Sequence, residues 1–424
     1  MLKSNKIFFI TGILFFCIFL QSNAQNHLNS PYSRFGMGDL MPRSSTAVTS
    51  MGGTGYTFQS TTSINFSNPA SYIGFDTLAF LMDAAFSLKT HTLLGGSNRQ
   101  KGTTMQFDYL AIGLSVQKWW RTSIGIQPYT IMNYTIEESH TFIQGDTLTQ
   151  NLSYYGEGGI NELYWGNAFR LFKNFSLGFN ASFLFGTYSK NRTIEWNDSI
   201  SFNSKIENMN KMRGFSLMLG AQYFIPIKDK GEIGIGLVYT PNIPIQSKGT
   251  NQISTYWGTD YSAKSIDTLY PQEDIKYSHK MPTVIGAGIS WSKKDKYYVG
   301  VDFTWGNWSK YTIDGNSDSL SDSYKISFGG YITPNHVSSK YFPRMTFSLG
   351  ANLEQTRLLL DGEHINKFGI NLGIFFPLKR TKTGFGVVFE YGQLGTVKLI
   401  KENYFKATLN VRIHERWYQR RKLD

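Results

Sequence analysis

Apolar and polar side chains alternate one by one along most of the chain after residue 76. In each alternating segment, bulky apolar residues lie on one face, while glycine, serine, asparagine or charged residues lie on the other. A period of two predicts β-strands with one apolar face. These strands are longer than the roughly 5–6 residues usual in globular proteins. The clearest examples are 175–185, 231–239, 368–376 and 405–413.

Long strands of this kind are typical of outer-membrane barrels, in which the apolar face contacts lipid and the other face lines the lumen. A water-soluble sandwich would use shorter strands and pack its apolar faces inward. We therefore predict an all-β fold, a 14-stranded antiparallel transmembrane β-barrel over residues 76–416. The predicted strands are 78–91, 103–117, 121–139, 160–171, 174–190, 205–225, 231–245, 277–291, 296–311, 323–333, 341–358, 364–377, 382–395 and 403–416.

The predicted connections alternate in length, as in barrels with short periplasmic turns and longer outer loops. Long loops are predicted at 140–159, 191–204 and 246–276. The short connections are basic, which places much of the net charge of +12 on one rim. Tryptophans near the strand ends favour girdles at headgroup depth. The basic residues are Lys118, Arg121, Lys173, Lys228, Lys230, Lys293, Lys294, Lys296, Lys379, Arg380 and Lys382, and the tryptophans are Trp119, Trp120, Trp165, Trp291, Trp305, Trp308 and Trp417.

The first 24 residues have the features of a secretory signal peptide. Lys3 and Lys6 precede an apolar stretch over 7–20, and Ser22-Asn23-Ala24 supplies the small residues that signal peptidase needs. We predict cleavage after residue 24 and export to the cell outer membrane. The single cysteine, Cys17, lies inside this peptide, so the mature chain is expected to contain no disulfide and no cysteine metal site.

Composition excludes several other classes of protein. Aromatic residues make up 16 % of the chain and charged residues 17 %, against about 25 % charged in typical soluble proteins. Disorder and coiled coils are therefore excluded, and export argues against a nucleic-acid partner. No G-x-S-x-G elbow and no H-E-x-x-H spacing occurs, so we expect no enzyme activity, no catalytic residues, no cofactor and no metal. The scattered histidines are His27, His91, His140, His279, His336, His364 and His414.

Residues 25–75 lack sustained alternation and are rich in glycine, serine, threonine and asparagine. They also contain too many apolar residues for a solvated tail. A barrel of about fourteen strands has room for a plug, so we predict that 25–75 form an N-terminal luminal hatch. Residues 417–424 follow the last predicted strand and are predicted to be a basic periplasmic tail of unassigned role.

Two short motifs in this region carry a family resemblance. The segment Met51-Gly52-Gly53-Thr54-Gly55-Tyr56, followed by Ile64-Asn65-Phe66-Ser67-Asn68-Pro69-Ala70-Ser71, resembles the N-terminal hatch of the FadL/TodX outer-membrane transport family, which includes PorV-like members. The resemblance implies a hatch-closed barrel of fourteen strands that captures apolar compounds outside and releases them sideways. It assigns the hatch motif to Gly52, Gly53, Gly55, Asn68 and Pro69.

Pro128 lies in the middle of the third predicted strand. Because proline cannot donate a ladder hydrogen bond, a mid-strand proline indicates an edge or a bulge. The resembling family has an inward kink in this strand that makes a lateral gap. Two interpretations therefore remain open, a neutral local bulge and a lateral portal beside Pro128.

Alternation also predicts which polar side chains face the lumen. Glu390 and Lys406 have the right parity to oppose each other in the last hairpin, and we predict a cross-strand pair with a structural role. Lys406 and Arg412 are alternatively candidates for binding an acidic head group. The predicted luminal polar residues are Asp302, Asn371, Glu390, Lys406, Asn410 and Arg412.

Two functions are compatible with these features. The first is outer-membrane transport of hydrophobic or amphipathic, fatty-acid-like molecules, which predicts an apolar pocket above the hatch and a portal near Pro128. The second is a non-transporting barrel that acts as a subunit or shuttle of an outer-membrane secretion or assembly complex. It predicts a filled lumen, no continuous path and ordered surface loops. The expected partners are outer-membrane lipid, a hydrophobic small molecule and an outer-membrane protein complex.

Overall fold

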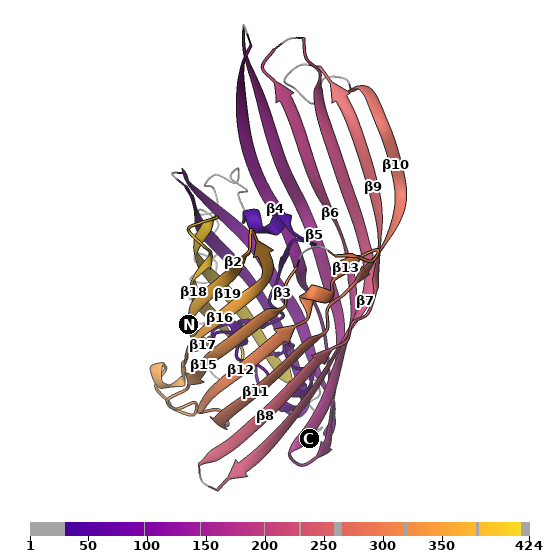
Figure 1. Cartoon of the computed structure of the whole chain (residues 1–424). Coiled ribbons are helices and arrows are strands. Elements are labelled where there is room, and N and C mark those ends of the chain that lie inside the picture. Colours follow the sequence, from indigo (N-terminus) through magenta and orange to yellow (C-terminus); the bar gives the residue numbers. More distant parts are fainter. Residues whose placement is uncertain are drawn as a thin grey trace, which may run out of the picture.

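The computed structural model describes residues 30–96, 98–144, 146–198, 200–228, 230–257, 265–317, 320–378 and 381–416. The predicted signal peptide and the predicted tail 417–424, with Trp417, lie outside these residues. Fourteen of the described strands form a closed antiparallel ring, because the last strand pairs with the first (Figure 1). In order around the ring they are β2 (Ala79–Gly95), β3 (Asn98–Gln117), β4 (Trp120–Gln144), β5 (Asp146–Phe172), β6 (Phe175–Trp196), β7 (Asn203–Ile227), β8 (Gly231–Thr240), β11 (Val284–Lys293), β12 (Tyr297–Gly306), β15 (Ser323–Ile332), β16 (Thr346–Leu360), β17 (Glu363–Pro377), β18 (Gly384–Gly395) and β19 (Lys401–Arg416).

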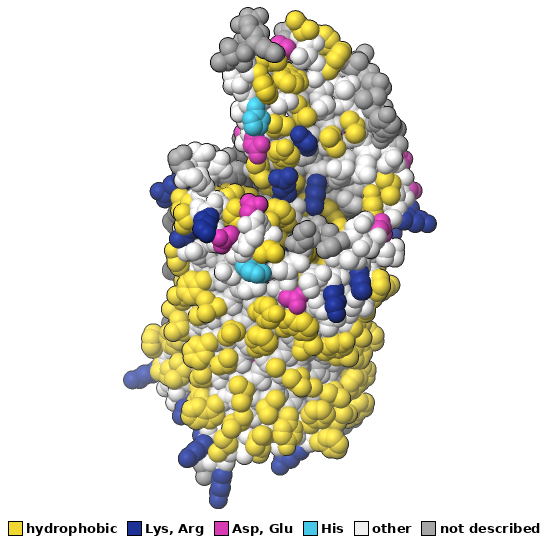
Figure 2. Space-filling view, viewed as in Figure 1, with side chains coloured by type: hydrophobic (Ala, Val, Ile, Leu, Met, Phe, Trp, Pro, Cys, Tyr) yellow, Lys and Arg dark blue, Asp and Glu magenta, His cyan; other side chains and the backbone are white. Residues whose placement is uncertain are grey.

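The predicted 14-stranded barrel is therefore confirmed. Its outer face carries a belt of exposed apolar side chains, with Lys and Arg at the lower rim (Figure 2). A broad apolar belt of this kind is stable against lipid and unstable in water, so the barrel spans a membrane. Typical belt residues are Leu219, Ile235, Leu237, Ile289, Val301, Phe328, Leu349, Ile370 and Leu409.

The predicted tryptophan girdle holds only in part. Trp119, Trp165 and Trp291 are exposed on the outer face. Trp308 is buried instead, because it lies in the short helix η4 (Trp308–Lys310), where its ring packs under the guanidinium of Arg357. The described helices are all short, and none is long and apolar enough to cross a membrane.

One side of the barrel continues upward as a tall wall. The upper part of β7, residues 203–213, pairs with β9 (Ile245–Tyr256), and β9 pairs with β10 (Ser265–Lys280). Together with β4, β5 and β6 these strands form an ordered six-stranded sheet, here called the wall, that rises above the rest of the ring (Figure 1).

The prediction of long loops at 140–159 and 246–276 is wrong, since most of these residues belong to β4, β5, β9 and β10. The stretch 191–204 is likewise strand up to Trp196. Polar residues occupy both faces of the wall in these stretches, so the apolar alternation that marks a buried or lipid-facing strand is absent. Pairing with long neighbouring strands supplies the order instead.

Residues 30–78 lie inside the ring. They contain η2 (Pro31–Arg34), β1 (Asp39–Leu40), α2 (Thr46–Thr49) and η3 (Pro69–Gly74), and most of their side chains are buried against the inner wall. We call these residues the N-terminal segment. Glycines on the luminal faces of the strands make room for it, because a Cβ atom there would overlap its backbone or side chains. These glycines are Gly178, Gly220, Gly236, Gly329 and Gly350.

Substitution of Gly350 by valine should loosen the N-terminal segment without opening the ring. A Cβ atom at this position would overlap the backbone of Met51 and Gly52, and overpacking of this kind costs about 1–3 kcal/mol. Limited proteolysis should therefore cut the segment faster, while the heat-modifiable mobility of the barrel on gels stays unchanged. Ala351→Val, whose side chain lies on the opposite face of β16, is the matched control. Equal cleavage of both variants would contradict the expected packing.

Candidate functional site

The glycine-rich motif forms a tight turn against the barrel wall. Gly52 and Gly53 follow α2 with φ of +70° and +92°, which favour glycine, and a Cβ atom on Gly52 would overlap the backbone of Ala351. After the turn, the N–H groups of Gly55 and Tyr56 donate to Asp302 Oδ2 at 2.6 and 2.8 Å. Asp302, on β12, therefore holds the motif to the inner face of the barrel.

The second motif is held to another part of the ring, formed by β6 and β7. Asn68 caps η3 by accepting a hydrogen bond from the Ala70 N–H at 3.1 Å. Its Nδ2 atom donates to the Tyr56 carbonyl at 2.7 Å and to the Ala221 carbonyl on β7 at 3.2 Å. Pro69 follows as the first residue of η3 and lies against Gly178. The hatch-motif residues thus all lie where the segment contacts itself or the ring.

All six predicted luminal polar residues lie on the inner face, and Lys406 has an additional partner that was not predicted. Glu390 and Lys406 are directly opposite in the β18–β19 register, as the parity indicated. Lys406 Nζ nevertheless lies 3.1 Å from Asp108 Oδ1, and Glu390 accepts a hydrogen bond from the Tyr404 hydroxyl at 2.7 Å. Glu390 and Lys406 are therefore the predicted cross-strand pair by register, while the lysine side chain reaches across β2 to pair with an acid on β3. Asn371, for its part, accepts from Asn352 Nδ2 at 3.4 Å.

Asn410 and Arg412 belong to a network centred on Asp83, a residue that the sequence pattern did not single out. Asp83 Oδ1 accepts from Asn410 Nδ2 at 2.6 Å and from the Tyr109 hydroxyl at 2.9 Å. Its Oδ2 accepts from the Ile64 N–H at 3.3 Å, and Arg412 Nε lies 3.9 Å from this oxygen. The signal was available, since Asp83 is an acid at a luminal position of the first strand.

A second anchor without a sequence signature joins the segment to the wall. Arg43 Nε donates to Glu162 Oε2 at 2.9 Å, and the Gln127 side-chain amide donates to the same oxygen at 3.0 Å. Glu162 is buried on β5, and the Arg43 guanidinium also lies over the ring of Tyr129. A buried carboxylate whose partner is removed is strongly destabilising, so this contact fixes the position of the segment.

Pro128 lies at a β-bulge beside an opening in the ring. The β3–β4 ladder ends at the pair Leu110–Ile126, and above it the two strands separate. The N-terminal segment fills this place, because β1 pairs with β4 through Asp39–Ile131 and Leu40–Thr130, and the Met41 N–H donates to the Tyr129 carbonyl at 3.0 Å. The side of the barrel where a portal was predicted is thus lined by the segment's own strand.

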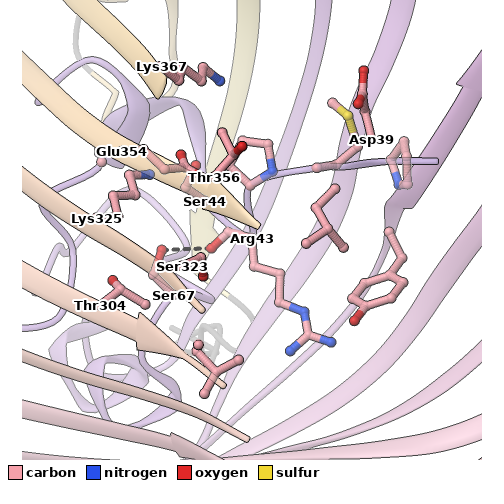
Figure 3. Close-up of a pocket in the computed structure, with 18 of the residues that line it drawn as sticks. Asp39, Arg43, Ser44, Ser67, Thr304, Ser323, Lys325, Glu354, Thr356 and Lys367 are labelled. Carbon is pink, nitrogen blue, oxygen red and sulfur yellow. Dashed lines mark hydrogen bonds between the residues drawn. The ribbon is translucent and has the colours of Figure 1, made fainter. Parts of the chain in front are cut away.

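A cavity of about 460 Å³ lies between the N-terminal segment and the inner face of the barrel. Figure 3 shows Arg43 of the segment and Lys325, Glu354 and Lys367 of the facing strands around this space. Charged side chains from β2, β3 and β15–β19 line one side, and apolar side chains from β4, β7 and the linkers after β8 and β10 line the other. Besides Asp39 and Arg43 of the segment, the charged residues are Lys89, Asp108, Lys325, Glu354, Arg357, Lys367, Glu390 and Lys406. The apolar ones include Pro128, Ile131, Met218, Ile243 and Met281, together with Val238 of β8 and Ile245 of β9.

The lining of this cavity includes residues at an interruption of the β7 ladder. Residues 214–218 of β7 pair neither with β8, whose ladder starts at Leu219–Tyr239, nor with β9, whose ladder ends at Arg213–Gln246. The cavity lining includes the inward-facing Ser216 and also Phe215, which is 69 % exposed on the outer face. We call this place the β7 seam. Prolines 241, 244 and 282 lie in the linkers beside it.

No group of three or more potential ligands that could hold a metal ion occurs among the described residues. The one carboxyl of the segment with a strongly shifted pKa is Asp39. Burial, and secondly the nearby charge of Glu402, raise the pKa of Asp39 to about 6. Lys89, Arg357 and Lys367 act in the opposite direction.

Acidification should tighten the N-terminal segment. Asp39 binds a proton near pH 6 when the segment is docked, but only near pH 4 when it is released. Proton binding by Asp39 therefore stabilises the docked state. This stabilisation is complete below the ordinary pKa of about 4 and is lost as the pH rises through about 6. Hydrogen exchange of the segment should therefore slow between pH 7 and pH 5, after correction for intrinsic rates. Asp39→Asn should make the exchange of the segment nearly independent of pH over this range, whereas the control Asp361→Asn, in the exposed β16–β17 turn, should keep the wild-type pH dependence. A wild-type pH dependence in Asp39→Asn would show that Asp39 is not the group responsible.

Asp302→Ala should release the glycine-rich turn. The change leaves the N–H groups of Gly55 and Tyr56 without their acceptor, and each buried unsatisfied group costs about 1–3 kcal/mol. Amide exchange at these two residues should accelerate by at least about tenfold. Ser327→Ala, on the luminal face of the neighbouring strand, is the control. Unaltered exchange in Asp302→Ala would show that the carboxylate does not anchor the turn.

Comparison with known proteins gives one family and one fold. The family model described as BamG matches residues 1–424. Three solved structures share the fold. A FadL homologue of Pseudomonas aeruginosa is 11 % identical with a TM-score of 0.59, and the match covers 89 % of this chain and 99 % of that chain. The toluene transporter TodX of P. putida (13 % identity, TM-score 0.60) and the toluene transporter TbuX of Ralstonia pickettii (12 % identity, TM-score 0.54) each match over 90 % of this chain and 100 % of theirs. No curated protein matches the sequence.

Proposed function

This chain belongs to the BamG family and has the barrel fold of the FadL-type structures, and on that premise we propose that it is an outer-membrane barrel whose main function is to bind a partner protein. In this proposal it is a subunit of an outer-membrane assembly. The N-terminal segment acts as a hatch that stays closed, and the wall presents the binding surface.

The wall is the observation that carries the proposal. Closing a barrel requires strands only as long as the membrane is thick, about 9–11 residues when tilted. β4 and β5 run for 25 and 27 residues, and β9 and β10 extend the sheet sideways. Long, ordered structure outside the hydrocarbon region has no role in spanning it, and ordered surface elements of this kind commonly carry binding function.

The closure of the lumen supports the same proposal. The segment is held by Asp302, by the Asp83 network and by the Arg43–Glu162 ion pair, which lie on different parts of the ring. It also pairs with β4 beside Pro128. A segment that is anchored on several sides and that pairs with a strand of the ring favours a closed barrel over a conduit. The transport function predicted an apolar pocket above the hatch, and the charged lining of the cavity fits an apolar solute less well than such a pocket would.

Shortening the wall tests this function. Replacing residues 137–153 by Asn-Gly joins Ile136 to Tyr154, which are opposite in the β4–β5 register, through a favourable hairpin turn. The tagged full-length chain, purified in mild detergent from the membranes of the bacterium that makes it, should carry a stoichiometric protein partner. The shortened chain should lose that partner while its barrel keeps the same heat stability. A partner retained in full, or a pure chain without any partner, would contradict the proposal.

A second function is favoured by one observation, that the cavity lining extends to the β7 seam, where Phe215 is exposed on the outer face. An amphipathic, fatty-acid-like molecule could enter there from the membrane, with its chain against Met218 and Ile243 and its acidic group toward Lys325. Lateral exchange would then use the seam and not the position beside Pro128, where β1 pairs with β4.

Loading of a fluorescent dodecanoate into the barrel in detergent micelles tests this second function. Ser216→Trp should fill the cavity side of the β7 seam and slow loading strongly, because Ser216 lines the cavity beside the exposed Phe215. Leu219→Trp adds the same ring on the outer face of β7 one row below, where β8 is paired, and should have no effect. If Pro128→Ala slowed loading and Ser216→Trp did not, the entrance would lie at the predicted portal beside Pro128 and not at the β7 seam.

A further inference from the structure

The wall has an open edge at β4. Below Ile126 this strand pairs with β3, and at Thr130 and Ile131 it pairs with β1. From Met132 to Gln144 the described residues provide no strand on this side, while β5 pairs with it on the other. An open strand edge is a template on which another chain can add a strand.

Alternation along β4 identifies the backbone groups that point away from β5. The Asn133 N–H donates to Ser33 Oγ at 3.3 Å, and the same hydroxyl donates to the Asn133 carbonyl at 3.1 Å. Asn133 therefore directs both groups to the open side. Because strand residues alternate, Thr135, Glu137, Ser139 and Thr141 do the same. The lower end of this edge already accepts β1, which shows that its geometry is suited to an added strand.

The other open edges of the barrel top are protected, and the β4 edge is not. β10 has three breaks of register against β9, a proline at 271 and a positive φ at Asp274. The upper part of β3 carries Arg99 and Lys101. Such bulges, prolines and basic residues are the usual devices that prevent edge pairing. β4 has no proline, lysine or arginine beyond Pro128, and its register with β5 is unbroken from Thr130 to Gln144.

Charge identifies the kind of strand that fits this edge. The β4–β5 hairpin, residues 133–160, contains Glu137, Glu138, Asp146 and Glu157 and no lysine or arginine, in a chain whose net charge is +12. Glu137 and Glu138 are exposed and point to opposite faces of the strand. Opposite charges on neighbouring strands stabilise a pair, and like charges directly opposite destabilise it. An acidic strand, or a second copy of this edge, is therefore disfavoured.

We propose that the edge of β4 from Thr135 to Gln144 is the binding site for the partner protein, which adds to it an extended strand that carries lysine or arginine. This inference rests on the proposed function, the binding of a partner through the wall. Main-chain hydrogen bonds to Thr135, Glu137, Ser139 and Thr141 supply the binding, and the two glutamates select a basic strand.

Single prolines and hydrogen exchange test the edge directly. Ser139→Pro removes an N–H that points away from β5, so the β4–β5 ladder remains, whereas Ser139→Ala keeps that N–H and removes only the hydroxyl. The full-length tagged chain is compared free and in the assembly isolated from the membranes of its own bacterium. In the assembly, the amides of 135, 137, 139 and 141 should become protected, while those of 134, 136 and 138 are protected in both states.

Ser139→Pro should weaken the assembly by about tenfold or more, because the partner's carbonyl that accepts from the Ser139 N–H would be left buried and unpaired. Ser139→Ala should bind like the wild type, and Glu137→Lys with Glu138→Lys should weaken binding without changing the backbone. Exchange at the even-numbered amides shows whether each variant is folded.

Failure of the inference differs from failure of the proposed function. If the wild-type chain forms a stoichiometric assembly that Ser139→Pro and the double lysine variant leave intact, and the odd-numbered amides gain no protection, the β4 edge is not the site, although partner binding stands. If the wild-type chain forms no assembly, both proposals are wrong.

Discussion

The structure depends on one constraint, that every backbone N–H and C=O group in the hydrocarbon layer must find a partner within the protein. A ring in which β19 pairs with β2 satisfies it without any edge. A ring of fourteen strands encloses more space than its own side chains fill. The luminal glycines widen that space further, and the N-terminal segment occupies it. The polar luminal side chains then serve as anchors for the segment, as Asp302 and Asp83 do.

The same constraint explains how the ring tolerates two places where neighbouring strands are not paired. Beside Pro128 the ladder between β3 and β4 ends, and β1 of the segment provides the missing hydrogen bonds. At the β7 seam no described strand replaces the lost pairs. There the linkers carry prolines 241, 244 and 282, which have no N–H group, so fewer donors are left without a partner. One opening is thus closed by added backbone, and the other is made less costly by removing donors.

The sequence determines the ring well, because lipid imposes alternation on every spanning strand and the parity of Glu390 and Lys406 follows from it. It does not determine side-chain partners: Lys406 reaches Asp108 two strands away, a contact set by barrel curvature and side-chain length. Nor does it determine the wall. Between 140 and 159 neither lipid nor a core demands apolar alternation, so strands there look like loops. The Arg43–Glu162 anchor joins residues far apart in sequence, and no local pattern marks it.

Above the membrane the constraint is relaxed, since water can satisfy an open strand edge. Edges that would be impossible in lipid therefore persist in the wall, and what distinguishes them is whether they are blocked. The β10 edge is broken by bulges and a proline, whereas the β4 edge keeps a regular register from Met132 to Gln144. Water satisfies such an edge but does not explain its regularity, because a hairpin that needed only solubility would tolerate prolines and lysines as β10 and β3 do. An edge kept in regular register, acidic and unblocked, in a structure whose β10 and β3 edges are blocked, is consistent with selection for pairing with another chain.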